Sequence, residues 1–476
     1  MIMKNAIVSA VVAALATVAL PSCIEDSVST SAADQPEFSS DTLRMGRVFT
    51  DEPTPTHQFR VYNRHDKVMS IADISFRDGG TGYFRINVDG QSGTRFSNVE
   101  IRPNDSIFVF VEATLPPNAS SAPVEIEDVV QFTTNGVSRQ VVLSALGQDV
   151  RRLHGKVISA DTLWTADLPH QIFDSLVVAP GATLTLQPGC RLYFHDGSDM
   201  RVRGTLRSLG SAQAPVIFGG DRTGTVAADI PYEVMSRQWV GVSFAPTSRD
   251  NRLEYTVIEN TWRGVVLDSI SGEDSGRRAI EMVNCRLRNS AGYALQAVHS
   301  SIAATGCEFA EGGAGVVYLR GGSHVIDHCT VSNNYLFSFM GGPMIGFANV
   351  SSVDPDGSGM PYVKAEITNT IVYGSGAPLS MDDLAGTEIF MRRCLIGVNG
   401  TDDDHFTDII WGEDPLWWTD RSRYIFDYRL RDDSPALGAS FTGIAPASAL
   451  PLPPTDFYGN PHPSPASVGA MEVRQQ

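Results

Sequence analysis

The chain has 476 residues, with 43 glycines, 27 prolines and only 19% charged residues. This length is too great for one ordinary globular core, whereas a solenoid can extend without that limit. The formal net charge of −18 at pH 7 argues against nucleic acid, and against polyanionic glycans, as primary partners.

The first 22 residues have the pattern of an export signal. Lys4 precedes an apolar run from Ala6 to Leu20 that is too short to span a bilayer comfortably. The run ends in Leu20-Pro-Ser-Cys23, which resembles the lipobox of bacterial lipoproteins. The resemblance implies a signal peptide over residues 1–22 and lipid attachment at Cys23, where two or more acyl chains would give a stable membrane anchor.

Residues 23–40 are rich in serine, threonine and alanine. They offer little apolar surface to bury, and we predict a flexible tether. Acidic residues follow Cys23 directly, in Ile24-Glu-Asp-Ser. This placement resembles the surface-export signals of Bacteroidota lipoproteins and implies an outer-membrane protein that faces the cell exterior.

Residues 41–150 contain short runs in which apolar and polar residues alternate, the pattern of half-buried strands. Examples are Tyr83-Phe-Arg-Ile-Asn-Val and Ser106-Ile-Phe-Val-Phe-Val. Asn135-Gly136 separates two further runs and is a strong signal for a two-residue hairpin turn. Several short strands without helical periodicity predict an antiparallel β-sandwich with an Ig-like architecture.

Residues 151–430 contain a repeat that predicts a parallel β-helix. Cys285, Cys307 and Cys329 recur at a spacing of 22 residues, which is the length of one solenoid coil. Apolar residues stand three positions before each cysteine and two positions after it. Steps of two indicate strands, and the step of three indicates a bend that resets which side chains face inward.

The residues at the predicted bend support this assignment of inward-facing positions. Asn284 and Gly306 occupy two of the bends, and both residue types tolerate left-handed backbone. Thr256 and Thr370 stand at cysteine positions in flanking coils. A metal site or a disulfide could not accept that replacement, so we predict that the cysteines pack in a small inward-facing column.

Further motifs resemble a known architecture. Val177-Val-Ala-Pro-Gly-Ala-Thr-Leu-Thr-Leu and Arg237-Gln-Trp-Val-Gly-Val-Ser-Phe244 introduce the repeat. Asp433-Ser-Pro-Ala-Leu-Gly-Ala439 and Asp456-Phe-Tyr-Gly-Asn-Pro461 end the chain, in residues 431–476. With the sandwich, they resemble Bacteroidota lipoproteins that join an Ig-like domain to a right-handed parallel β-helix of the pectate-lyase-like superfamily. The resemblance implies an all-β fold with a C-terminal closing segment over residues 431–476, and it leaves the activity open.

Enzymatic alternatives have weak support in the residues. A β-elimination lyase needs a base and a cationic group to neutralise the uronate, but the arginines show no spacing peculiar to lyases. A glycoside hydrolase needs two opposed carboxylates. Asp382-Asp383 is the obvious pair, yet neighbouring strand residues point to opposite sides. We therefore predict no catalytic residue, with a polysaccharide lyase or glycoside hydrolase as the alternative.

An acidic turn is the candidate metal site. Asp402, Asp403 and Asp404 follow Asn399-Gly400 in a predicted loop. Their carboxylates are the hard oxygen ligands that calcium prefers. Acidic turns more often bind only water, so calcium is a minor expectation and no other cofactor is predicted.

Aromatic residues cluster near the C-terminal end of the repeat. They are Trp411, Trp417, Trp418, Tyr424 and Tyr428. Exposed aromatic rings are platforms for sugar rings, but the open end of a solenoid also has to be covered. The sequence as a whole predicts a surface lipoprotein that binds a polysaccharide or an envelope protein, with these aromatics as the candidate sugar contacts.

Overall fold

The structure is a computed structural model that describes residues 27–222, 224–226, 230–268, 277–337, 341–350, 362–380 and 384–474. The predicted signal peptide, Cys23 and Asp382-Asp383 lie outside these residues. Within them, no helix is long and apolar enough to cross a membrane. The chain divides into two compact units, one comprising the chain up to Asn118 with Val124–Gly147, the other Ala119–Pro123 with the chain from Gln148 onward.

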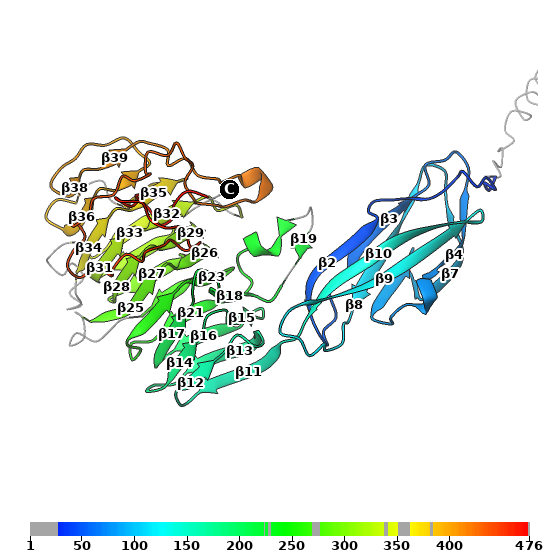
Figure 1. The fold of residues 1–476 in the computed structure, drawn as a ribbon, viewed down its shortest axis with the longest axis horizontal. Helices are drawn as coiled ribbons and strands as arrows, with labels where there is room; N and C mark the ends of the chain where they lie inside the picture. Colours follow the sequence, from blue (N-terminus) through cyan, green and yellow to red (C-terminus); the bar gives the residue numbers. More distant parts are fainter. Residues whose placement is uncertain are drawn as a thin grey trace, which may run out of the picture. The chain divides into compact units, whose positions relative to one another are not determined.

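The first unit is the predicted antiparallel sandwich, built from two five-stranded sheets (Figure 1). In spatial order, one sheet contains β1 (Glu37–Phe38), β3 (His57–Tyr62), β8 (Ser106–Ala113), β5 (Phe84–Val88) and β6 (Gln91–Gly93). The other contains β2 (Thr42–Phe49), β10 (Val137–Gln148), β9 (Val124–Thr134), β4 (Met69–Phe76) and β7 (Arg95–Ile101). A single 3₁₀ turn, η1 (Arg77–Gly79), follows β4.

Alternation along the strands builds the core of the sandwich. In β3, Phe59 and Val61 are buried while Gln58 and Arg60 face solvent, because successive side chains of a strand point to opposite sides. The hairpin predicted at Asn135-Gly136 is confirmed: β9 ends at Thr134, β10 begins at Val137, and both turn residues have positive φ. Two successive positive φ angles are typical of the type I′ turn.

Part of the predicted tether is ordered. The ring of Phe38 packs 4.8 Å from that of Phe132 in the sandwich core, and the Gln35 side-chain amide donates to the Thr134 carbonyl at 3.1 Å. Val28 forms an isolated bridge with Val68. The prediction of a flexible segment that extends to Ser40 is therefore wrong from Val28 onward, because a few apolar and amide side chains suffice to hold this stretch on the sandwich.

The second unit is a right-handed parallel β-helix whose coils contribute strands to three faces (Figure 1). The first face comprises β16 (Asp199–Val202), β21 (Gly241–Phe244), β24 (Val265–Leu267), β27 (Leu295–Val298), β30 (Val317–Arg320) and β33 (Ile345–Ala348). The second face comprises β12 (Thr162–Trp164), β14 (Thr183–Leu186), β17 (Thr205–Leu209), β22 (Asn251–Glu254), β25 (Arg278–Val283), β28 (Ser301–Thr305), β31 (Gly322–Asp327), β34 (Val363–Thr368), β36 (Glu388–Arg392) and β38 (Phe406–Thr407). The third face comprises β15 (Arg191–Phe194), β18 (Val216–Gly220), β23 (Thr256–Glu259), β26 (Arg286–Ser290), β29 (Glu308–Gly312), β32 (Thr330–Asn333), β35 (Ile371–Gly374), β37 (Leu395–Ile396) and β39 (Ile410–Trp411).

The first and third faces belong to one large sheet. They meet at β13 (His170–Val178), whose first part pairs with β15 and whose second part pairs with β16. The strand β11 (Arg151–Ile158) pairs with β13 at the start of this sheet. Outside the three faces lie a short antiparallel pair, β19 (Thr225–Val226) with β20 (Ile230–Pro231), and the 3₁₀ turns η3 (Tyr232–Val234) and η5 (Arg421–Arg423).

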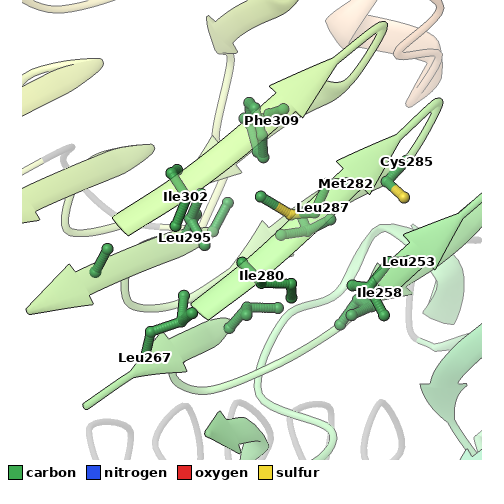
Figure 2. Close-up of a cluster of buried hydrophobic side chains, with 14 of the residues drawn as sticks. Leu253, Ile258, Leu267, Ile280, Met282, Cys285, Leu287, Leu295, Ile302 and Phe309 are labelled. Carbon is green, nitrogen blue, oxygen red and sulfur yellow. The ribbon is translucent and has the colours of Figure 1, made fainter. Parts of the chain in front are cut away.

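The inward-facing column predicted from the 22-residue repeat is confirmed. Met282, Cys285 and Leu287 are each at most 1% exposed, and Figure 2 shows them among the buried side chains of neighbouring coils. The register aligns Met282 with Ala304 and Leu287 with Phe309. Equivalent residues of successive coils therefore stack on one another and fill the tube.

The bend between the second and third faces adopts the predicted left-handed backbone. Asn284, Gly306, His328 and Asn369 occupy equivalent bends with φ between 46° and 67°. A side chain at Gly306 would also collide with the Asn284 carboxamide oxygen. Asparagine and histidine adopt the same backbone at the equivalent bends, so the space beside the Asn284 side chain is what favours glycine at position 306.

A hydrogen-bonded ladder connects the cysteine column. The Cys285 amide lies 3.4 Å from the Cys307 sulfur, and the Cys307 amide lies 3.4 Å from the Cys329 sulfur. In the next coil Thr370 Oγ1 accepts from the Cys329 amide at 3.2 Å. All five cysteines among the described residues are free and buried, so their role is packing, as the threonine replacement predicted.

The ladder gives a stability prediction. Cys307→Thr preserves both the acceptor and the size of the side chain, so the free energy of unfolding should change by less than about 1 kcal/mol. Cys307→Leu adds volume to a fully buried column and should cost about 1–3 kcal/mol. Equilibrium unfolding in urea measures both values. Equal destabilisation by the two substitutions would contradict the role assigned to the ladder.

Candidate functional site

A groove runs along the outer side of the first face. In β16, Met200 and Val202 are buried while Arg201 is exposed. The register then places Arg201 beside Ser243, Ser243 beside Val266, and Val266 beside Gln296. Neighbouring strands lie about 4.8 Å apart, so this row extends roughly 14 Å along the axis of the β-helix.

We call this site the arginine groove. Its volume is about 390 Å³, within the range of small-molecule sites. The side chains used below to argue its chemistry are Arg201, Arg203, Ser243, Arg263, Val266, Asp268 and Gln296.

The three arginines differ in how far their charge is already compensated. Arg201 donates from Nε to Asp199 at 2.7 Å. Arg203 and Arg263 are exposed, and neither guanidinium has an ion pair or hydrogen bond within the described part of the chain. Each of these planar groups presents five donors in a geometry that matches carboxylate or sulfate oxygens.

The groove departs locally from the acidic average of the chain. The net charge of −18 predicts poor attraction for polyanions, but net charge does not describe individual patches. Among the described residues that line the groove, Asp268 carries the only carboxylate. Hydrolysis of the two-carboxylate type needs an opposed pair. The described part of the groove can therefore bind an anionic chain, and it presents no second carboxylate opposite Asp268.

The structure does not assemble the predicted aromatic residues into one exposed platform. Tyr428 is 1% exposed, whereas Trp418 is 47% exposed. The ring of Trp417 lies edge-on between those of Tyr428 and Tyr373 and borders a separate pocket of about 260 Å³. Their use as sugar contacts stays a prediction, with Trp418 offering the most open ring.

The other two aromatic residues have local structural contacts. Trp411 donates to Asp402 at 3.0 Å and packs 5.3 Å from Phe406. Tyr424, with a left-handed φ of 58°, ends the 3₁₀ turn η5. Trp411 thus stabilises the turn that contains Asp402, which sequence composition alone does not reveal.

The closing segment, residues 431–476, packs along the side of the β-helix, where it covers parts of the second and third faces. Leu450 packs against Val283 and Ala303, and the Ala470 amide donates to Thr330 at 3.0 Å. Phe457 packs on Val257, several coils away. These contacts of the closing segment spread over successive coils, whereas Trp411, on the last strand of the third face, packs against the central core. That the aromatic residues cover the open end of the solenoid stays a prediction.

Beneath this segment lies a buried charge network formed by Arg286, Arg288, Glu308, Glu311 and Tyr428. Glu308 is fully buried and accepts from Arg286 at 3.1 and 3.3 Å, while Arg288 lies 3.6 Å away. Arg288 also lies 3.5 Å from Glu311, and the Tyr428 hydroxyl donates to Glu311. These contacts fix the segment around Tyr428 on strands β26 and β29.

Burial controls proton affinity in this network. Loss of water around the carboxyl raises the pKa of Glu311 to about 7, against the pull of Arg288. Burial and the neighbouring Glu311 raise the pKa of Tyr428 well above its ordinary value. A carboxyl with such a pKa could transfer protons, but Glu311 is only 3% exposed and is hydrogen-bonded to Tyr428. The network therefore has a structural role, because it holds the segment around Tyr428 on the third face.

The predicted calcium ligands serve their own loop. Asp402 accepts from the Asp408 amide at 2.7 Å and from Trp411. Asp403 accepts from the His405 and Phe406 amides at 2.7 and 2.9 Å. Within the described residues, no group of three or more histidine, cysteine or acidic side chains is placed to hold a metal ion. Calcium binding by Asp402, Asp403 and Asp404 stays a prediction.

The arginine groove was missed at the sequence level. Arg201 and Ser243 become neighbours only through the register of two coils, and the chain between them contains strands of other faces with connections of irregular length. The available signal was the exposed position of Arg201 between two apolar residues of a short strand. That signal predicts that the Arg201 side chain points outward, but it does not predict which strand lies beside β16.

Comparisons with known proteins reveal only distant likenesses. No protein-family profile and no curated protein matches the chain. Over 78% of its length, the chain is similar to the catalytic unit of a GH87 α-1,3-glucanase from Streptomyces thermodiastaticus, covering 91% of that chain at 9% identity and a TM-score of 0.22. Over 24% of its length, it is similar to a family 123 glycoside hydrolase from Clostridium perfringens, at 9% identity and a TM-score of 0.17. The match spans 25% of the Clostridium enzyme, and neither likeness bears on the activity of this chain.

Proposed function

We propose that this protein binds an acidic polysaccharide in the arginine groove and does not cleave it. The observation that carries the proposal is the pair of guanidiniums of Arg203 and Arg263, which have no ion-pair partner among the described residues, at a groove that crosses four successive coils. Charge-assisted hydrogen bonds from arginine to a carboxylate or sulfate are among the stronger polar contacts in proteins. A linear acidic glycan presents such groups at regular intervals along its length.

The remaining groove residues suit the sugar itself. The Gln296 side chain is half-buried and has no hydrogen bond within the described residues, so its amide is available to sugar hydroxyls. Val266 provides an apolar surface for the face of a ring, and the Ser243 hydroxyl lies next to it in the register. Along the row, a guanidinium, a hydroxyl, an apolar side chain and an amide thus follow one another.

The cellular setting of the proposal is the outer membrane, with Cys23 as the lipid attachment site and the binding units outside the cell. The support is the sequence Leu20-Pro-Ser-Cys23 and the acidic residues that follow it. A glycan-binding unit tethered to the cell surface would retain polysaccharide or hold an envelope component in place.

Titration of the purified full-length protein with an oligogalacturonate octasaccharide tests the function. We expect binding that weakens as salt rises. The double variant Arg203→Gln/Arg263→Gln should lower the affinity about tenfold to a hundredfold. Arg139→Gln/Arg207→Gln is the matched control, because it changes the net charge equally at exposed sites outside the groove.

The same samples are assayed for new reducing ends and for unsaturated ends. Intact octasaccharide with groove-dependent binding supports the proposal. Cleaved products that disappear in a groove variant would establish the lyase or hydrolase alternative instead. Equal loss of affinity in the groove variant and the control variant would remove the site assignment.

A further inference from the structure

A second pocket lies in the sandwich and shares no residue with the arginine groove. It has a volume of about 750 Å³ and is lined by β5, β6, β8 and the residues beside them. Along β8, the inner Val109 and Val111 are buried, whereas Phe108, Phe110 and Glu112 lie on the outer side. The size is within the range of pockets that hold small organic ligands.

Phe110 forms an exposed aromatic surface in this pocket. Its side chain is 36% exposed, a large value for a phenylalanine on a sheet with polar neighbours. Its ring stacks on that of Phe108 at 5.8 Å, and the Arg60 guanidinium covers the Phe108 ring at 4.5 Å. The register places Gln58 and Asn87 on either side of Phe110. The Phe110 ring is thus supported by Phe108, and Gln58 and Asn87 lie on its two sides.

The charged groups of the pocket compensate one another. Arg85 lies 3.6 Å from Glu112, and Glu112 also accepts from the Thr56 hydroxyl at 2.6 Å. Asn87 donates to Ser92 at 3.1 Å, and its own carbonyl oxygen is buried without a hydrogen bond within the described residues. The pocket therefore offers donors and acceptors together, without an uncompensated charge.

We propose that this pocket binds a neutral hexopyranose unit of a glycan. The apolar face of such a ring fits the Phe110 surface, because aromatic rings contribute large contact areas at low entropic cost. The hydroxyls of the sugar both donate and accept, which matches the amides and the Arg85–Glu112 pair. The charge balance favours a neutral ligand here, whereas the arginine groove attracts an anionic one. The two sites are independent, and neither proposal requires the other.

Saturation-transfer NMR on the full-length protein tests the pocket with three probes, cellohexaose, maltohexaose and mannohexaose. At least one probe should bind through protons on the apolar face of its ring. Phe110→Ser should weaken that binding at least tenfold, and Phe110→Tyr should retain it because the ring is preserved. Leu146→Ser, at a site of similar exposure on the other sheet, controls for unspecific effects, and thermal unfolding verifies that each variant is folded.

The outcomes separate this proposal from the proposed function. Loss of neutral-sugar binding in Phe110→Ser, with unchanged binding in Arg203→Gln/Arg263→Gln, supports the pocket. No binding of any of the three probes, or undiminished binding by Phe110→Ser, overturns it. Loss of the neutral probe in the groove variant alone also overturns it, since the sugar would then occupy the groove.

Discussion

Replacing Glu308 with leucine is expected to lower the free energy of unfolding by about 3–5 kcal/mol. Glu308 is fully buried and is the one carboxylate among the described residues that lies within 4 Å of both Arg286 and Arg288, whose side chains are 13% and 14% exposed. Without it, Arg286 has no acidic ion-pair partner among the described residues. The cost arises mainly from that uncompensated charge, because one partner of a buried pair is removed while the other remains. Urea unfolding at pH 7 measures the change.

Glu281→Leu is the matched control for Glu308→Leu. Glu281 also contacts two arginines, Arg252 at 2.8 Å and Arg278 at 2.9 Å, but its side chain is 32% exposed. Exposed ion pairs contribute little because solvent screens them, so the expected loss is below about 1 kcal/mol. Similar losses in the two variants would show that the network beneath the closing segment is no more important than a surface ion pair.

Glu311 is expected to make the protein less stable as the pH rises from about 4.5 to about 7. Burial raises the pKa of this carboxyl to about 7 from an ordinary value of 4.5. Within that interval the folded state keeps a proton that the unfolded state releases, so stability falls as pH increases. Below the interval both states are protonated, and above it the loss is complete. The difference between the two pKa values corresponds to up to about 3 kcal/mol.

Glu311→Gln isolates this contribution, since glutamine keeps an oxygen for the Tyr428 hydroxyl but does not titrate. The variant should gain stability relative to the natural protein as the pH rises from 5 to 8, measured by urea unfolding at one-unit intervals. Tyr428→Phe removes a hydrogen bond that lowers the pKa of Glu311 and should move the transition to higher pH. A pH-independent difference between Glu311→Gln and the natural protein would contradict the assignment.

The repeat of the β-helix could be predicted from sequence because its constraints are local and recur. Each coil needs inward residues on both sides of a bend. Met282, Cys285 and Leu287 meet that need within six residues of sequence. The hairpin at Asn135-Gly136 was predictable for the same reason, since positive φ at two successive residues restricts residue choice. The contacts of Gln35 and Phe38 with the sandwich were not, because they join segments far apart in the chain.

The candidate site was less accessible to sequence reasoning. Aromatic residues at the C-terminal end attracted attention by composition, yet Tyr428 is buried by Glu311 and Asn334 from distant coils. Arg203 and Arg263 are ordinary in the sequence and gain significance from two facts of the fold: they line the same groove, and neither has an ion-pair partner among the described residues. Both facts depend on which strands lie side by side and on which side chains are in contact. These are properties of the folded chain.

The most direct test of groove binding is a crystal structure of the full-length protein grown with the oligogalacturonate octasaccharide. The account predicts sugar carboxylates within hydrogen-bond distance of the Arg203 and Arg263 guanidiniums, with the glycosidic bonds across β16, β21, β24 and β27 intact. An octasaccharide bound elsewhere on the protein, or shortened products in the groove, would contradict it.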